Sequence, residues 1–147
     1  MRQTARMRDP LPWLVEAGLL APDACDAVRR APLAGGWWND VQRLRAPGID
    51  WVVKIYAEGG DSTLFPLLPA DEARALDVLA GHAIAPDPVA YLARSAERPA
   101  VLVYAFHAGT PWDGDVEAVA DLLRRQHALA ATGFRDVPTD GAGIVQG

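Results

Sequence analysis

The sequence predicts an α+β fold: a curved antiparallel sheet of about five strands with one packed helix, an N-terminal helical cap and a C-terminal helix. Short stretches with alternating apolar and polar residues, separated by glycine and proline turns, indicate the strands. Residues 69–82 and 115–131 instead space their apolar side chains as amphipathic helices do. A chain with 50% hydrophobic and 22% charged residues has the composition of a folded globular domain.

Composition also restricts the class of partner. The net charge of -5 disfavours nucleic acid, because binding its phosphates requires clustered basic residues. No apolar run approaches the length that a membrane span requires, so we expect no membrane partner. The single cysteine, Cys25, excludes an internal disulfide and fits a reducing compartment. We therefore expect a cytoplasmic protein.

The first thirty residues predict a loose tail followed by a helical cap. Pro12–Gly18 and Pro22–Arg30 have proline near their starts, a position that helices tolerate, and Gly18 fits the end of the first. No chemically distinctive side chains gather in this segment, so we expect these two helices to cover an edge of the sheet.

Two strands and a tight turn are expected next. Leu33–Trp37 predicts a first strand that leads into a glycine turn. Val41–Arg45 alternates apolar and polar side chains, so this second strand has one buried face. Pro47-Gly48 supplies the hairpin turn that leads into a third strand.

The third strand, Trp51–Tyr56, carries the only lysine among the 14 lysine and arginine residues of the chain. Side chains alternate between the two faces of a strand, so Lys54 shares a face with Val52 and Tyr56. A compact ammonium on a flexible stem is suited to meeting a phosphate as a point charge. The alternative is a structural lysine that pairs with any nearby carboxylate.

A helix is predicted from Pro69 to about His82. Glu72 lies one turn before Leu76, on the stripe of this helix that faces the sheet. A carboxylate in that position needs a partner, because burying an unpaired charge is costly. The ammonium of Lys54 on the neighbouring strand would satisfy both groups, so we predict a Lys54–Glu72 ion pair.

Two more strands and a last helix complete the prediction. The strands are expected at Val89–Ala93 and Ala100–Phe106, followed by a linker. Asp115 is placed to cap a final helix that runs to about Ala131. Apolar residues between Val116 and Ala130 form one stripe of this helix.

This order of elements resembles the N-terminal lobe of the protein-kinase-like fold, specifically the aminoglycoside phosphotransferase and choline kinase superfamily of small-molecule kinases. The fragments that carry the resemblance are Leu33–Asn39, Trp51–Tyr56, Pro69–Leu76, Ile84–Pro88, Val101–Tyr104 and Leu122–Leu129. The resemblance divides the chain into a tail and cap (1–30), a kinase-like N-lobe (31–107), and a linker, helix and irregular tail that would begin a C-lobe (108–147).

The resemblance implies a nucleotide site that binds ATP or GTP. Lys54 matches the strand lysine that contacts the α and β phosphates, and Glu72 matches the helix glutamate that holds this lysine. The turn with Gly35, Gly36 and Asn39 would cover the phosphates with backbone N–H groups.

The resemblance also implies how the base is held. Val41 and Val52 would form an apolar ceiling over adenine. The backbone at Ala105 and His107 would correspond to the hinge that hydrogen-bonds the adenine edge. Ala105 stands where many relatives carry an acidic residue, so we expect this contact to come from the backbone.

The catalytic residues of the resembled superfamily have no match in this chain. Their aspartate base and Mg²⁺ ligands lie in a C-terminal lobe, within a His-Gly-Asp motif and a later Asp motif, and no His-x-Asp occurs here. We therefore expect these 147 residues alone to be catalytically incompetent, with Mg²⁺ bound only in the presence of a complete C-lobe. The alternative is a non-catalytic module that uses the 116–130 helix for self-association or for binding the missing lobe.

Overall fold

The structure is a computed structural model that describes residues 7–34, 38–57, 67–110, 114–130 and 132. Its elements, in chain order, are α1 (Leu11–Glu16), the 3₁₀ helix η1 (Pro22–Ala27), β1 (Arg29–Pro32), β2 (Asp40–Ala46), β3 (Ile49–Ile55), α2 (Pro69–Leu79), β4 (Pro88–Leu92), β5 (Val101–Ala105) and α3 (Val116–His127). Each helix within the described ranges is too short or too polar to cross a lipid bilayer.

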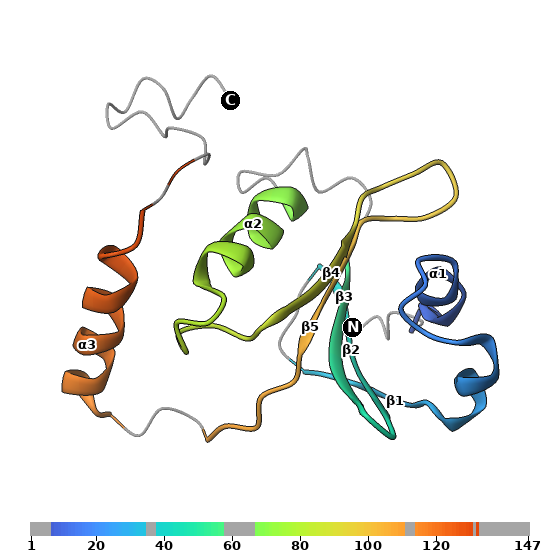
Figure 1. The fold of residues 1–147 in the computed structure, drawn as a ribbon, viewed down its shortest axis with the longest axis horizontal. Coiled ribbons are helices and arrows are strands. Elements are labelled where there is room, and N and C mark those ends of the chain that lie inside the picture. The colour runs from blue at the N-terminus through green and yellow to red at the C-terminus, as the bar shows by residue number, and fades with distance from the viewer. Residues whose placement is uncertain (1–6, 35–37, 58–66, 111–113, 131, 133–147) are drawn as a thin grey trace, which may run out of the picture.

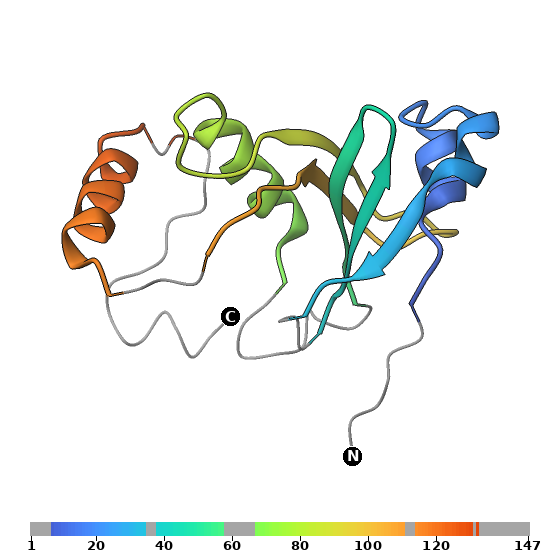
Figure 2. The same cartoon turned by 90° about the horizontal axis from the view of Figure 1, so that it is seen from below.

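The strands form one five-stranded sheet in the order β1-β2-β3-β5-β4, with every neighbouring pair antiparallel. Helix α2 lies on one side of this sheet and α1 on the other, and α3 lies beyond α2 (Figure 1). The view from below shows the same arrangement, with α1 and α3 at opposite ends of the molecule (Figure 2). The predicted α+β fold with a five-stranded antiparallel sheet and one packed helix is thus confirmed.

The larger core lies between the sheet and the N-terminal cap. Leu14 and Leu20 from the cap are buried against inward-facing strand residues, including Leu44, Val53 and Val103. The cap therefore packs on a face of the sheet, and the prediction that it covers an edge is wrong. The physical reason is that alternation leaves this face of β2, β3 and β5 largely apolar, with Gln42 as a buried polar residue, and burying it against leucines stabilises both layers.

The second core lies on the α2 side of the sheet. Tyr56, Ala73, Ala100 and Leu102 are buried there, and Leu76 packs against them. The two faces of β3 thus divide as the alternation predicts. Helix α2 ends at Leu79, a few residues before the predicted end at His82. Gly81 ends it with a positive φ of 75°, a conformation that favours glycine.

The first strand lies earlier in the chain than predicted. β1 is Arg29–Pro32, whereas the prediction placed it at Leu33–Trp37, whose residues 35–37 fall outside the described part of the chain. An edge strand with mostly exposed side chains needs no apolar alternation, so the polar sequence of β1 gives no strand signal. Because β1 already begins at Arg29, the second cap helix, η1, ends at Ala27 instead of reaching Arg30.

Helix α3 begins as predicted, because the Asp115 side chain caps it and accepts a hydrogen bond from the Ala118 N–H at 2.9 Å. It ends at His127, before the predicted end at Ala131. Arg125 on this helix donates to the carbonyl oxygens of His82 and Ala83, in the loop that follows α2. This contact ties α3 to the connection between α2 and β4.

Candidate functional site

Lys54 of β3 and Glu72 of α2 form the predicted ion pair. The Lys54 Nζ lies 2.7 Å from each Glu72 carboxylate oxygen. The side chains are 20% and 40% exposed, so the pair is shielded on the sheet side and open to solvent on the other. Val41 of β2 and Leu102 of β5 flank Lys54 on the neighbouring strands. The result is an ammonium fixed in an apolar surround, with one of its three N–H groups not needed by the two carboxylate contacts.

Tyr56 is a third member of this cluster that sequence reasoning left without a role. Its hydroxyl donates to the Glu72 Oε2 at 2.5 Å, and its ring centroid lies 5.0 Å from the Lys54 Nζ. The signal was present in the sequence, since Tyr56 lies two residues after Lys54 and thus on the same face of the strand. The side chain is buried, with 1% of the residue exposed.

Burial is the main cause that raises the pKa of the Tyr56 hydroxyl above its ordinary value, and the hydrogen bond to Glu72 and the charge of this carboxylate add to the effect. Burial likewise raises the pKa of Tyr104, which lies on the same face of the sheet. Both phenols therefore keep their protons in the folded protein at a pH where an unfolded chain has lost them.

We expect the protein to lose stability in alkaline solution because of this difference. Raised folded-state pKa values stabilise the fold fully below the ordinary tyrosine pKa of 10.0, and this contribution disappears as the pH rises further. Denaturant unfolding of wild type and Tyr56→Phe from about pH 9 to about pH 11 measures the contribution of Tyr56. The free energy of unfolding should fall more steeply with pH in wild type, and equal slopes would contradict the assignment.

The predicted phosphate-covering turn is only partly described. Gly35 and Gly36 lie outside the described residues, whereas Asn39 lies just before β2. The Asn39 Oδ1 accepts a hydrogen bond from the Ala57 N–H at 3.1 Å. Its side chain thus ties the start of β2 to the end of β3, close to Lys54.

The predicted ceiling over the base contains an additional cluster that the sequence did not reveal. Arg43 lies directly opposite Val52, and its guanidinium binds both Asp50 carboxylate oxygens at 2.7 Å. The same guanidinium lies 3.4 Å from the ring centroid of Phe106. Val52 is only 5% exposed, so a base placed on this face would meet Arg43 and Phe106 as well as the two predicted valines.

The hydrogen bond from Arg43 is the largest cause that lowers the pKa of the Asp50 carboxyl, and the same bond raises the pKa of Arg43. Both groups are therefore charged over the whole physiological range. The ion pair presents a planar, preorganised surface next to the predicted position of the base.

The predicted hinge is positioned by backbone hydrogen bonds at the end of β5. The Ala105 N–H donates to the Asp87 carbonyl and the Phe106 N–H to the Asp50 carbonyl, both at 2.9 Å. Any hinge contact from Ala105 must therefore use its carbonyl oxygen. His107 is exposed and lines a hollow of about 290 Å³ together with residues 83–86.

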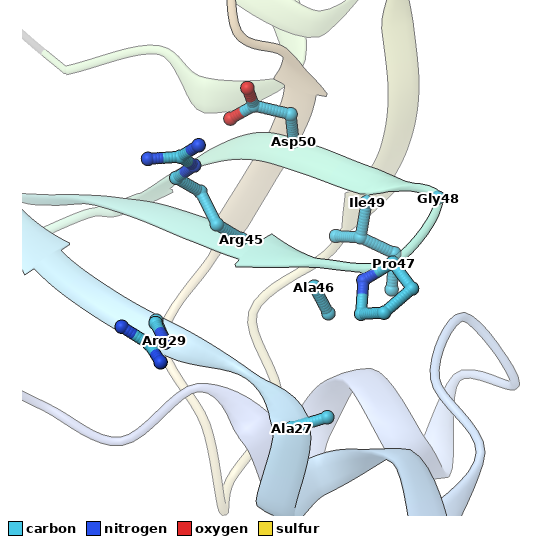
Figure 3. A pocket seen from close by; sticks show the side chains of 8 residues that line it. All are labelled: Ala27, Arg29, Arg45, Ala46, Pro47, Gly48, Ile49 and Asp50. Carbon is cyan, nitrogen blue, oxygen red and sulfur yellow. The ribbon is translucent and has the colours of Figure 1, made fainter.

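A larger hollow of about 610 Å³ lies at the end of the β2–β3 hairpin, away from the Lys54–Glu72 pair. Figure 3 shows Arg45 and Asp50 on the hairpin strands and Arg29 on β1 around this space. None of the predicted site residues that the structure describes lines it. We place the candidate site at Lys54 because a charged group held by two partners is a more specific feature than an open hollow.

Within the described ranges, no three His, Cys, Asp or Glu side chains gather closely enough to hold a metal ion. The ionisable groups of this cluster are the ammonium of Lys54, the carboxylate of Glu72 and the phenol of Tyr56. Of these, the ammonium can bind an anion.

An open antiparallel sheet of five strands, with a third-strand lysine paired to a glutamate of the packed helix, defines a kinase-like N-terminal lobe. The chain belongs to the phosphotransferase enzyme family, whose model it matches over residues 29–143. No curated protein and no solved structure gave a significant match. The family assignment therefore comes from the family model, and it agrees with the resemblance found in the sequence.

Proposed function

We propose that this chain is the nucleotide-binding lobe of a small-molecule O-phosphotransferase of the aminoglycoside or choline kinase type, which uses ATP or GTP in the cytoplasm. The observation that carries the proposal is the Lys54 ammonium held between both Glu72 oxygens at 2.7 Å. Membership of the phosphotransferase enzyme family supports it.

The proposed binding mode assigns one task to each part of the site. Lys54 would donate its remaining N–H to the α and β phosphates, while Glu72 keeps the ammonium in place. The base would lie under Val41 and Val52, with the Ala105 carbonyl and the His107 backbone at its edge. The 35–39 turn would cover the phosphates.

The proposal is limited to binding the nucleotide. The chain contains no His-x-Asp sequence, so we assign none of its residues to the transfer step itself. Mg²⁺, when bound with the nucleotide, would neutralise phosphate charge, and we propose that a C-terminal lobe supplies its ligands.

A second candidate function is self-association through α3. Val116, Val119, Leu122 and Leu123 are 63%, 39%, 37% and 43% exposed on this helix. Apolar side chains exposed together favour contact with another surface. Light scattering over a range of concentrations tests this function, and a monomer throughout would contradict it.

The single lysine allows a specific test of the proposed nucleotide site. An adenosine analogue with an amine-reactive sulfonyl fluoride in place of its phosphates should modify Lys54, and excess ATP should protect it. A protease that cleaves after lysine cuts the denatured chain only between Lys54 and Ile55, so modification leaves the chain uncut. Cleavage that is unaffected by the analogue, or modification that ATP does not slow, would contradict the proposal.

A further inference from the structure

We propose that Tyr56 is a positioning residue for the nucleotide site: its hydroxyl fixes the Glu72 carboxylate, which in turn holds the Lys54 ammonium for the phosphates. This inference rests on the proposed function. Its structural basis is one shared atom, because the Glu72 Oε2 accepts from Lys54 at 2.7 Å and from the Tyr56 hydroxyl at 2.5 Å.

The two partners of Glu72 differ in rigidity. Tyr56 is 1% exposed and packs in a core with Ala73, Ala100 and Leu102, so its hydroxyl has a fixed position. The Glu72 side chain is 40% exposed and has several rotatable bonds. A hydrogen bond from a rigid donor therefore orients a carboxylate that solvent would otherwise leave mobile.

Tyr56 also keeps Glu72 hydrogen-bonded when a ligand binds to Lys54. When Lys54 donates its remaining N–H to a phosphate, its positive charge is shared between the phosphate and Glu72, so its attraction for the carboxylate weakens. The Tyr56 hydroxyl continues to donate to the Oε2, so the carboxylate keeps a partner. The face of the Tyr56 ring, whose centroid is 5.0 Å from the Nζ, favours the ammonium in the same position.

The competing explanation is that Tyr56 is a core residue whose hydroxyl merely needs a partner. Tyr104 provides a matched control, because it lies on the same face of the sheet and packs against the same core. Among the described residues, Glu72 accepts hydrogen bonds from Lys54 and Tyr56, and not from Tyr104. A structural role would change stability without changing the behaviour of Lys54.

The first experiment needs no nucleotide. Wild type, Tyr56→Phe and Tyr104→Phe are treated with limiting acetic anhydride, and acylation of Lys54 is read from loss of the single cut by the lysine-specific protease. Tyr56→Phe should raise the acylation rate about threefold or more, because a less firmly held ion pair opens more often and only a side chain released from Glu72 can attack the anhydride as the free amine. Tyr104→Phe should match wild type. Equal rates in all three proteins, or equal increases in both variants, would overturn the inference.

The second experiment measures affinity for ATP. Tyr56→Phe should weaken binding by about tenfold, the size expected for losing a hydrogen bond to a charged group, whereas Tyr104→Phe should leave it unchanged. If wild type binds no nucleotide, the proposed function fails, and the acylation rates alone decide the role of Tyr56.

Circular dichroism checks that both variants fold. Should Tyr56→Phe not fold, the ¹⁵N ammonium signal of Lys54 in the wild-type protein decides instead, since the chain has no other lysine. An ordered ammonium with slow hydrogen exchange supports positioning of the pair by Tyr56. A freely rotating ammonium with rapid exchange overturns it.

Discussion

Replacing Leu14 by alanine is expected to lower the free energy of unfolding by about 2–5 kcal/mol, the range observed when a buried leucine is truncated. Leu14 is 0% exposed and lies in the core with Leu44, Val53 and Val103. The substitution removes apolar contact and leaves a cavity between the cap and the sheet. Because Val53 lies next to Lys54 in β3, a loosened cap would also disturb the strand that carries the site.

Leu123→Ala is the matched control. It removes the same atoms from a helical leucine that is 43% exposed instead of buried. Its effect should stay within about 0.5 kcal/mol. Denaturant unfolding followed by tryptophan fluorescence measures both variants. A small loss for Leu14→Ala, or similar losses for the two, would show that the N-terminal cap is not part of the folded core.

Replacing Lys54 by methionine is expected to weaken ATP binding by roughly 10- to 100-fold, the range for a lost hydrogen bond between charged groups. The substitution keeps the length of the stem and removes the ammonium that faces Glu72. The carboxylate then lacks its counter-charge and repels the phosphates. Competition against a fluorescent nucleotide measures the change.

Lys54→Arg separates charge from geometry. Arginine keeps the positive charge, so it should preserve pairing with Glu72 and most of the stability. Its planar guanidinium is larger than an ammonium and cannot act as a point charge between Val41 and Leu102, so affinity for ATP should still fall. Wild-type affinity in Lys54→Arg would indicate that charge alone is sufficient.

Local patterns were enough to predict the Lys54–Glu72 pair. Alternation assigned Lys54 to one face of its strand, the helical period turned Glu72 toward the sheet, and each group needed a partner. The nucleotide role of the pair stays a prediction. The strands β2 to β5 were also found from local patterns, since β2 alternates buried and less buried residues and β5 begins with a continuous buried apolar run.

Features that depend on the register between strands, or on which surface a segment covers, could not be predicted. The stacking of Arg43 on Phe106 depends on which residues of β2, β3 and β5 lie side by side, and this register is not encoded in any one segment. The sequence of β1 lacks a strand pattern because its side chains are mostly exposed. The cap was assigned to an edge because its apolar residues do not specify which surface of the sheet they cover.

The central claim is that this chain binds a nucleotide through Lys54. Titration calorimetry of ATP into the purified wild-type chain and into Lys54→Met tests it most directly. The structure predicts saturable heat of binding for wild type and a strongly reduced signal for a variant that is folded by circular dichroism. No binding by wild type, or equal affinity in the two proteins, would contradict the claim.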